Sequence, residues 1–247
     1  MSRQSLSSAY RPLSGFSPLP SDPVAPELLL PMPLPDGIDG RDMWYTGGEL
    51  SSTTLTASYR QGFFPWQGDP LGWCSPDPRF VIWPDSWHVP RSLRRIIKKS
   101  RWRISWNADP AAVVRSCMTV ARSGESGTWL TQEMVDAYSE LAIHGYMQSG
   151  EIWNEEGLLI GGLYGVLVGT VFVGDSMFSA AANASKLAFA RCAEHLWQAG
   201  VTMIDCQVYS DHLAQFGAVE ISRASYLHHL RQQRDVELLD ARRLFHF

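Results

Sequence analysis

Apolar and polar positions alternate with helical spacing in most of the first half of the chain. Ser51–Gln61 starts with Ser and Thr residues, continues with helical spacing and is followed by a glycine, so it predicts a helix. Pro110–Val120 and Thr131–Ala142 predict two more helices on the same grounds. Phe80–Trp83 and Trp102–Trp106 are short runs rich in β-branched and aromatic residues, which predict strands.

The second half changes to a strand pattern. Three consecutive antiparallel strands are predicted, with Gly157 and Gly169 as turn residues between them. A helix should follow, capped by Asn183 and ended by Gly200. The predicted elements, in order, are strands Gly150–Trp153, Leu158–Val168 and Thr170–Met177, a helix to Ala199, strand Val201–Val208, helix Asp211–Phe216, strand Val219–Ile221 and helix Arg223–Arg231. Strands and helices in this order indicate an α+β fold.

The first forty residues differ in composition from the rest. They hold eight of the fifteen prolines and many serines, which is typical of an irregular, extended segment. We expect folded structure to begin near Gly47, and a Gly/Pro/Asp-rich loop to lead from Trp66 to Pro78. The predicted organisation is therefore an irregular lead-in (1–44), a small N-terminal domain (45–82) and a larger C-terminal domain (83–247).

One segment concentrates positive charge. Residues 87–103 carry seven Lys or Arg residues and no acid, and the remaining 14 basic residues face 25 acids, a balance of −11. The cations at Arg91, Arg94, Arg95 and Lys98 share one face of a predicted helix. Such a charge run is often only a solvated face, but against an acidic remainder it favours a polyanion bound at one place.

Several protein classes are excluded by composition. The four cysteines lie far apart without metal-like spacing, which suits reduced thiols, and no apolar run approaches the length of a membrane span. The first residues do not resemble a signal peptide, although a Ser-rich transit segment stays an alternative. We expect a cytoplasmic protein that binds no metal.

The common catalytic motifs are also missing. The chain has no GxSxG, GxxxxGK[ST] or HExxH motif, and its seven histidines are scattered, so a nucleophilic triad is disfavoured. Instead, the chain contains a series of unusual short motifs in this order: YTGGELS (45–51), SYRQGFFPW (58–66), SPDPR (75–79), GTWLT (127–131), GGLYGV (161–166), GDSMFS (174–179), ASKLA (184–188), IDCQV (204–208) and HLAQFGAVEI (212–221).

This ordered set resembles the leucyl/phenylalanyl-tRNA–protein transferases over about residues 45–230. The resemblance implies a small N-terminal α/β domain and a C-terminal acetyltransferase-like (GNAT-type) mixed sheet flanked by helices. It implies transfer of Leu or Phe, and sometimes Met, from aminoacyl-tRNA to the N-terminus of proteins that begin with Lys or Arg, which marks them for degradation. An aminoacyl ester is already activated, so we expect no cofactor, and a monomer suffices.

The resemblance also assigns residues at the reacting centre. The family's strand word DCQ corresponds to Asp205 and Gln207, which alternation places on one face of a strand with Cys206 on the other. Asp205 would orient Gln207 or hold a cationic amine, and Gln207 would position by hydrogen bonding. The family's glutamate in GESMFS is here Asp175, one methylene shorter. The alternative for Asp205 and Gln207 is a satisfied polar cluster beside an open sheet.

Other positions are assigned to the two substrates. Four aromatic residues match positions around the terminal adenosine and the acceptor, although core packing is an equal alternative for each: Tyr59, Trp66, Trp129 and Tyr138. Leu163, Phe172 and Cys192 match an apolar aminoacyl pocket, in which Cys192 is smaller than expected. The basic helix matches the region that contacts acceptor-stem phosphates, with Arg91, Arg94, Arg95, Lys98 and Lys99.

The chain departs from the family near the first strand. Family members usually carry HS(V/I)E there, whereas this chain has Gln148-Ser149-Gly150-Glu151. Three other functions compete with the leading one. They are tRNA-dependent transfer to a small-molecule amine, an acyl-CoA acetyltransferase, which Phe178–Lys186 disfavours because it lacks a phosphate-binding glycine loop, and a non-catalytic tRNA-binding module.

Overall fold

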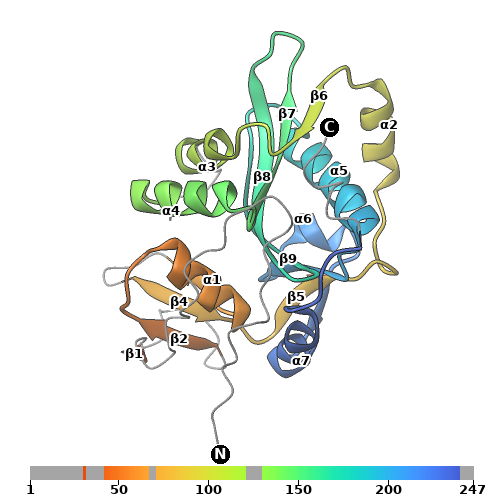
Figure 1. The fold of residues 1–247 in the computed structure, drawn as a ribbon. Coiled ribbons are helices and arrows are strands. Elements are labelled where there is room, and N and C mark those ends of the chain that lie inside the picture. The colour runs from red at the N-terminus through yellow and green to blue at the C-terminus, as the bar shows by residue number, and fades with distance from the viewer. Residues whose placement is uncertain (1–29, 32–41, 67–70, 121–129, 240–247) are drawn as a thin grey trace, which may run out of the picture.

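The computed structural model describes residues 30–31, 42–66, 71–120 and 130–239. Trp129 therefore lies outside the described residues. The fold is mixed α+β, with one small antiparallel sheet and one larger mixed sheet flanked by helices (Figure 1). None of the helices in these ranges is long and apolar enough to cross a membrane.

The small sheet has the strand order β1-β2-β4-β3, and all its pairs are antiparallel. The strands are β1 (Leu30–Pro31), β2 (Met43–Thr46), β3 (Phe64–Trp66) and β4 (Gly72–Ser75), and helix α1 (Ser52–Arg60) lies between β2 and β3 in the chain. Trp73 is fully buried in this sheet and donates from Nε1 to the carbonyl oxygen of Gly47 at 3.0 Å. A single large side chain thus fills much of a small core.

Two predictions for this region were wrong. Two described strands, β1 and β2, come before Gly47, near which folded structure was expected to begin. The Gly/Pro/Asp-rich segment after Trp66 contains β4, which pairs on both sides with β2 and β3. Strands of three or four residues give almost no periodic signal, so their pairing could not be predicted from the sequence.

The large sheet has the order β11-β5-β10-β9-β8-β7-β6. All neighbours are antiparallel except β10 and β9, which run parallel and are joined by a crossover through helix α5. The strands are β5 (Arg79–Ile82), β6 (Arg103–Trp106), β7 (Met147–Trp153), β8 (Leu159–Val168), β9 (Val171–Ser179), β10 (Met203–Gln207) and β11 (Val219–Ile221). This is the larger mixed sheet, flanked by helices, that the family resemblance implied.

Strand β5 belongs to the large sheet because it pairs with β10 and β11. The predicted boundary after residue 82 would leave this strand in the N-terminal domain. We propose a boundary between Ser75, the end of β4, and Arg79, the start of β5. The two sheets would then each be complete within one domain.

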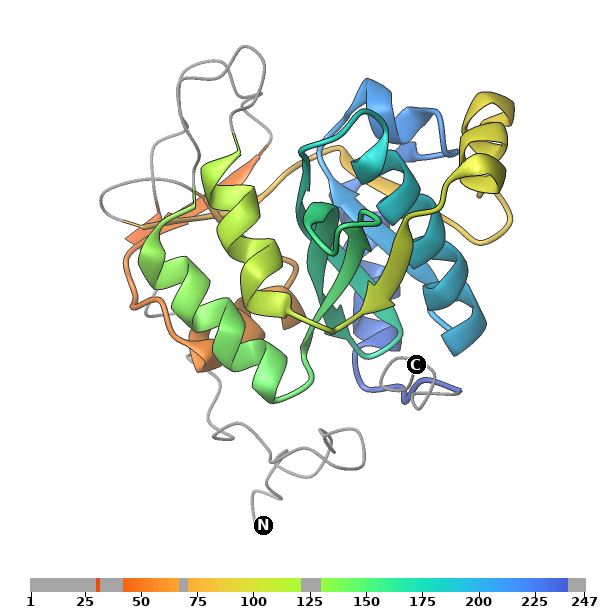
Figure 2. The ribbon, with the colours of Figure 1, turned by 90° about the horizontal axis from the view of Figure 1, so that it is seen from above.

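Helices cover both faces of the large sheet (Figure 2). Helices α3 (Pro110–Thr119) and α4 (Gln132–Ile143) lie on one face, while α5 (Ala184–Ala199) lies on the other with α2 (Arg91–Lys99) beside it. The short α6 (Asp211–Ala214) and α7 (Arg223–Gln233) complete the C-terminal part. Two apolar clusters result, one on each face of the sheet.

Helix capping followed the sequence signals only in part. Thr131 caps α4, because its side chain accepts from the backbone N–H of Met134 at 3.3 Å. Asn183 does precede α5, but it has φ +69° and its side chain makes no capping hydrogen bond. Asparagine tolerates the left-handed region better than most residues, and that tolerance explains its place here.

Candidate active site

Asp175 occupies a β-bulge on β9. The β8–β9 register passes from Tyr164 paired with Ser176 to Gly165 paired with Gly174, which leaves Asp175 as the extra residue. A bulge locally breaks the ladder and redirects a side chain. The bulge directs the carboxylate toward the junction between the large sheet and α1.

A second bulge lies on the neighbouring strand β10. Its pairing with β5 passes from Asp205 opposite Val81 to Gln207 opposite Phe80, so Cys206 is the extra residue. The parallel pairing of β9 with β10 also ends at Asp205. The two strands therefore stop pairing where both are bulged, and polar side chains occupy that point.

The Asp175 carboxylate has one occupied oxygen and one without a partner. Oδ1 accepts from the Tyr59 hydroxyl at 2.7 Å and from Gln207 Nε2 at 3.0 Å. Oδ2 is shielded from solvent and has no hydrogen-bond partner among the described residues. Burial raises the pKa of Asp175 to about 7, although the hydrogen bonds from Tyr59 and Gln207 act to lower it.

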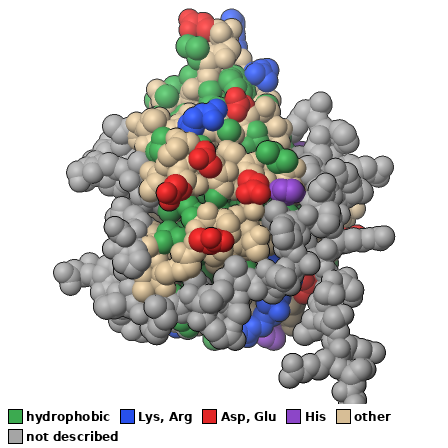
Figure 3. Space-filling view, turned by 60° about the vertical axis from the view of Figure 1, so that its left-hand side comes forward, with side chains coloured by type: hydrophobic (Ala, Val, Ile, Leu, Met, Phe, Trp, Pro, Cys, Tyr) green, Lys and Arg blue, Asp and Glu red, His purple; other side chains and the backbone are tan. Residues whose placement is uncertain are grey.

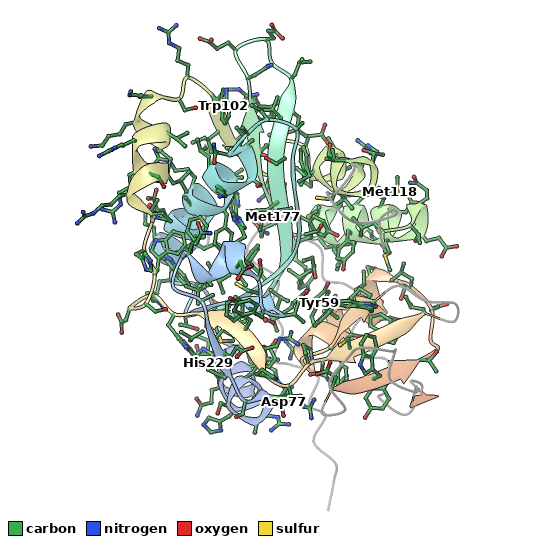
Figure 4. All side chains as sticks on the ribbon, turned by 180° about the vertical axis from the view of Figure 1, so that it is seen from behind. Tyr59, Asp77, Trp102, Met118, Met177 and His229 are labelled. Carbon is green, nitrogen blue, oxygen red and sulfur yellow. The ribbon has the colours of Figure 1, made fainter. Side chains whose placement is uncertain are left out.

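Two tyrosines form a hydrogen-bond chain that ends at this carboxylate. The hydroxyl oxygens of Tyr59 and Tyr138 are 2.6 Å apart, and because Tyr59 donates to Asp175, Tyr138 must donate to Tyr59. Burial and the Asp175 charge raise the pKa of both phenols well above the usual value, so both stay neutral donors. Tyr59 lies where the N-terminal domain meets the large sheet (Figure 4).

Neither tyrosine ring is open to a base. Tyr59 is 1% exposed and Tyr138 is fully buried, with its ring packed edge-on against Tyr164 at 5.0 Å between centroids. Stacking requires an accessible ring face. The structure therefore connects Tyr59 directly, and Tyr138 through Tyr59, to Asp175, and their contact with an adenosine or an acceptor stays a prediction.

Asp205 forms a buried ion pair with Arg79. Arg79 Nε donates to Oδ1 at 2.8 Å and Nη2 donates to Oδ2 at 2.5 Å, and both side chains are fully buried. Burial acts to lower the pKa of Arg79, but the Asp205 charge outweighs it and the pKa is raised. Asp205 Oδ1 also accepts from the backbone N–H of Gln207 at 2.8 Å. Both carboxylate oxygens are thus engaged, so Asp205 orients Gln207 and has no free oxygen for a cationic amine.

Arg79 is the residue that sequence reasoning missed. It ends the motif SPDPR and is the first residue of an apolar strand. This position was the available signal, because a charged residue at the start of a buried strand needs a buried partner of opposite charge. Its guanidinium also donates to the carbonyl oxygen of Gly62 and to the Tyr226 hydroxyl, at 3.2 and 3.3 Å. The rings of Tyr226 and Phe64 pack on it, with their centroids 4.3 and 4.9 Å from Cζ.

The residues predicted for the aminoacyl pocket lie on the opposite face of the sheet. Leu163, Phe172 and Cys192 are all buried in the apolar cluster on the α5 side, whereas Tyr59 and Tyr138 belong to the other cluster. A Cβ atom added to Gly150 would come within 2.0 Å of Cys192 Sγ. Gly150 thus leaves the space that the Cys192 side chain occupies.

Comparisons with known proteins agree with this architecture. The family profile described as "Leucyl/phenylalanyl-tRNA protein transferase" matches residues 81–231, and the profile for its N-terminal domain matches residues 48–77. This chain belongs to that family. The transferase of that name from Pseudomonas fluorescens (strain Pf0-1) is 47% identical over 175 residues, covering 70% of this chain and 76% of the relative.

Relatives from other bacteria give the same result. The leucyl/phenylalanyl-tRNA–protein transferase of Azotobacter vinelandii is 47% identical, over 66% of this chain and 72% of its own length. That of Myxococcus xanthus is 44% identical, over 75% of this chain and 79% of its own length. The two profiles meet between residues 77 and 81, which agrees with a domain boundary ahead of β5.

The departure from the family word HS(V/I)E forms a buried polar cluster. Gln148 Oε1 accepts from Asn107 Nδ2 at 2.7 Å and from Trp106 Nε1 at 3.2 Å. The buried Glu151 accepts from the hydroxyls of Ser149 and Ser105, each at 2.6 Å. These groups are hydrogen-bonded to one another and join β6 to β7, so the buried polar groups at the departure have partners.

Helix α2 presents the predicted phosphate-contacting residues to solvent. Leu93 is buried and Ile96 and Ile97 are half-buried, which anchors one face of the helix. Five cations are exposed on it: Arg91, Arg94, Arg95, Lys98 and Lys99. None of the five pairs with an acid of the described residues within 4 Å, and basic side chains extend outward from the helix in Figure 4.

The remaining predicted aromatic residue lies in the small sheet. Trp66, in β3, is half-buried, and its ring meets Trp44 at 5.7 Å and Phe64 at 5.8 Å between centroids. No hydrogen bond described for the chain connects it to Asp175. It stays a prediction for substrate contact.

Proposed function

We propose that this chain transfers Leu or Phe from aminoacyl-tRNA to the N-terminal amine of proteins that begin with Lys or Arg. Family membership supports the reaction class. The observation that supports the chemistry is the unpartnered, buried Oδ2 of Asp175, on a carboxyl group with a pKa of about 7. A group with a pKa near the working pH can accept a proton and release it again.

The reaction needs positioning and one proton acceptor. The acceptor ammonium loses a proton to the Asp175 carboxylate, and the free amine attacks the ester carbonyl. The new carbon–nitrogen bond forms, the ester carbon–oxygen bond breaks, and the ribose oxygen leaves with a proton taken from the attacking nitrogen. Gln207 Nε2 holds the other oxygen of Asp175 at 3.0 Å, so Oδ2 keeps a fixed direction.

The donor substrate engages three further regions in this proposal. Helix α2 binds acceptor-stem phosphates through its exposed cations. The aminoacyl side chain enters the apolar cluster on the α5 face, where Leu163, Phe172 and Cys192 select it by apolar volume. Trp66 and Trp129 stack on the terminal adenosine. Tyr59 and Tyr138 hold the carboxylate.

The acceptor is a cation, and charge distribution supports this choice. Helix α4 carries three exposed acidic residues, Glu133, Asp136 and Glu140. The face in Figure 3, toward which α4 turns, shows more acidic than basic side chains. Such a surface attracts the cationic N-terminus of an acceptor. It also repels tRNA phosphates, so the tRNA binds at α2 instead. In this proposal the protein acts as a monomer in the cytoplasm, where the added residue marks the acceptor for degradation.

A transfer assay tests the acceptor. The protein is incubated with labelled leucyl- or phenylalanyl-tRNA and peptides that differ only in an N-terminal Arg, Lys or Ala. We expect label on the Arg and Lys peptides and little on the Ala peptide. N-acetylated copies of the same peptides are the matched control and should take no label. Transfer to small amines but to no peptide would instead support the small-molecule alternative.

A salt titration tests the role of α2. Replacing Arg94, Arg95 and Lys98 with Ala should weaken tRNA binding and reduce the slope of log K against log salt by about 3, because each lost phosphate contact removes about one unit. Arg231→Ala, on the exposed surface of α7, is the matched control and should leave the slope unchanged. An unchanged slope in the triple variant would place the tRNA elsewhere.

A further inference from the structure

Arg79 is linked to both hydrogen-bond donors of Asp175, although no hydrogen bond joins it to either. Its guanidinium is fully buried and reaches two domains at once. Nε and Nη2 hold the Asp205 carboxylate on β10, and Nη1 donates to the carbonyl oxygen of Gly62, which follows α1. The rigid fork of an arginine can bind several acceptors in one fixed geometry.

The first link leads to Gln207. Asp205 Oδ1 accepts from the Gln207 backbone N–H at 2.8 Å, and Gln207 has φ +67°. A side chain other than glycine adopts this left-handed conformation only where its surroundings enforce it. In this conformation Gln207 Nε2 reaches Asp175 Oδ1. Movement of Asp205 would therefore release the amide from the carboxylate.

The second link leads to Tyr59. The backbone N–H of Gly62 donates to the Tyr59 carbonyl oxygen at 3.0 Å, so the carbonyl that Arg79 binds belongs to the turn that ends α1. Gly62 has φ +88°, and a Cβ there would come within 2.4 Å of Leu227 Cδ2. The turn is thus fixed against α7, and Arg79 fixes it to the large sheet. Tyr59 donates to Asp175 from this anchored helix end.

We propose that Arg79 is a positioning residue for transfer, which orients Gln207 through Asp205 and Tyr59 through Gly62, and so sets both hydrogen-bond donors to Asp175. The inference rests on the proposed function, in which Asp175 accepts the proton of the amine. It gives the N-terminal domain a role in the reaction, because the donor from α1 is correctly placed only when the two domains are in register.

The groups that face Asp175 predict a pH signature. They are Tyr59 from α1, Tyr138 from α4, Gln207 and Asp205 from β10, and Arg79 from β5. Burial raises the pKa of Asp175 most, the hydrogen bonds from Tyr59 and Gln207 lower it, and the Asp205 charge raises it while the Arg79 charge lowers it. If the Arg79 guanidinium no longer fixes Asp205 and Gly62, the hydrogen bonds from Gln207 and Tyr59 that lower the pKa of Asp175 become weaker. The acidic limb of the pH–rate profile should then move to higher pH.

Arg79→Lys tests the proposal because it keeps the charge but loses the fork. We expect kcat to fall about 10²-fold, the loss typical of a displacement of about 1 Å. KM for aminoacyl-tRNA should change by less than about twofold, and the acidic limb should move up. Arg60→Lys is the matched control, since Arg60 also joins α1 to the C-terminal part, through Asp235 and the Arg234 carbonyl oxygen. It should leave the acidic limb in place.

Two further measurements keep the test decisive. A carbon-13 titration of the Asp175 carboxyl group should show the same upward shift in Arg79→Lys without any turnover. In a Gln207→Ala background, Arg79→Lys should cost much less than in wild type, because the two residues act in one chain. If Arg79→Lys does not fold, Tyr226→Phe, which removes one partner of the guanidinium, should shift the titration in the same direction.

The outcomes separate the two proposals. A wild-type protein that transfers label, with an Arg79→Lys variant that matches Arg60→Lys in kcat and in the carboxyl titration, overturns the role of Arg79. The same holds if Tyr226→Phe stands in for an unfolded variant and leaves the titration unchanged. A wild-type protein that transfers to no acceptor overturns the proposed function, whereas the titration still reports whether Arg79 orients the donors.

Discussion

Asp175 is the extra residue of the bulge on β9 and Asp205 directly precedes the bulge on β10, and the two carboxylates have opposite surroundings. Asp205 is fully buried and meets a guanidinium through two hydrogen bonds and a backbone N–H through a third. Asp175 meets only neutral donors, a phenol and an amide, and one of its oxygens has no partner among the described residues. Two acids on adjacent strands thus differ in whether a cation compensates their burial.

This difference separates an anchoring role from a proton-transfer role. A fully paired carboxylate is an anchor, because changing its protonation or position disrupts the whole ion pair. A carboxylate that is buried without a cation has a raised pKa and can exchange a proton near neutral pH. The sheet therefore places a carboxylate paired with a cation beside one without a cation, with Gln207 hydrogen-bonded to both.

Asp175→Asn should have the largest effect on transfer. It removes the proton acceptor but keeps a polar side chain of the same size, so kcat should fall about 10²- to 10⁴-fold, the contribution typical of a positioned base. Single-turnover transfer from labelled leucyl-tRNA to an Arg peptide measures it. Asp175→Glu, which restores the family residue, should retain far more activity. A kcat within threefold of wild type in the Asn variant would remove Asp175 from the chemistry.

Asp205→Asn should have the largest effect on stability. It leaves the buried Arg79 charge without its carboxylate, and breaking a buried pair costs about 3–5 kcal/mol. Urea denaturation measures the loss in the free energy of unfolding. Glu194→Gln breaks the exposed pair with Arg191 and is the matched control, for which less than about 1 kcal/mol is expected. Equal losses in the two variants would contradict the anchoring role.

The pH dependence of stability should also distinguish the two aspartates. The Asp175 pKa is about 7 in the folded state against 3.8 for an ordinary carboxyl group, so the folded state holds the proton over a wider range. This group therefore stabilises the fold fully at low pH, and its contribution is lost as pH rises from 3.8 to about 7. The Asp175→Asn variant lacks this pH-dependent contribution to the free energy of unfolding.

The measurement is urea denaturation of wild type and Asp175→Asn across that range. The variant should gain stability relative to wild type as pH rises from about 4 to about 7, and the gain should level off above pH 7. A difference that stays constant from pH 4 to pH 8 would mean that burial does not raise this pKa.

Sequence reasoning succeeded where signals were local. The succession of antiparallel strands β7, β8 and β9 follows from long periodic segments and turn glycines. Asp205 and Gln207 do meet at one centre, but the bulge at Cys206 lies between them, so strand alternation alone does not place them there. The ordered words then indicated Asp175 as a third member. The hydrogen bond from Gln207 to Asp175 spans 32 residues of sequence, but both residues had already been assigned to one centre.

It failed where the deciding contact is distant and the local signal is weak. Tyr59 and Tyr138 are 79 residues apart, and no local pattern indicated the buried hydroxyl contact that links Tyr138 through Tyr59 to Asp175. Arg79 and Asp205 are 126 residues apart, and an arginine at the start of an apolar strand indicates that a buried partner is needed but not which residue it is. The small sheet was missed because its strands depend on pairing rather than on periodicity.

Tyr138→Phe should have the smallest effect on the carboxylate that lacks a cation. It removes the donor to Tyr59, two hydrogen bonds away from the reacting proton, so a net loss of about 1 kcal/mol is the upper expectation, or about fivefold in kcat. Because the hydrogen bond from Tyr59 to Asp175 then weakens, the acidic limb should move slightly to higher pH. Tyr59→Phe, which removes the donor itself, should move it further in the same direction. Tyr45→Phe, in β2 with its ring against Phe63, is the control and should move nothing. A pH–rate profile of the three variants orders them, and a larger shift for Tyr138→Phe than for Tyr59→Phe would contradict the direction of the hydrogen-bond chain.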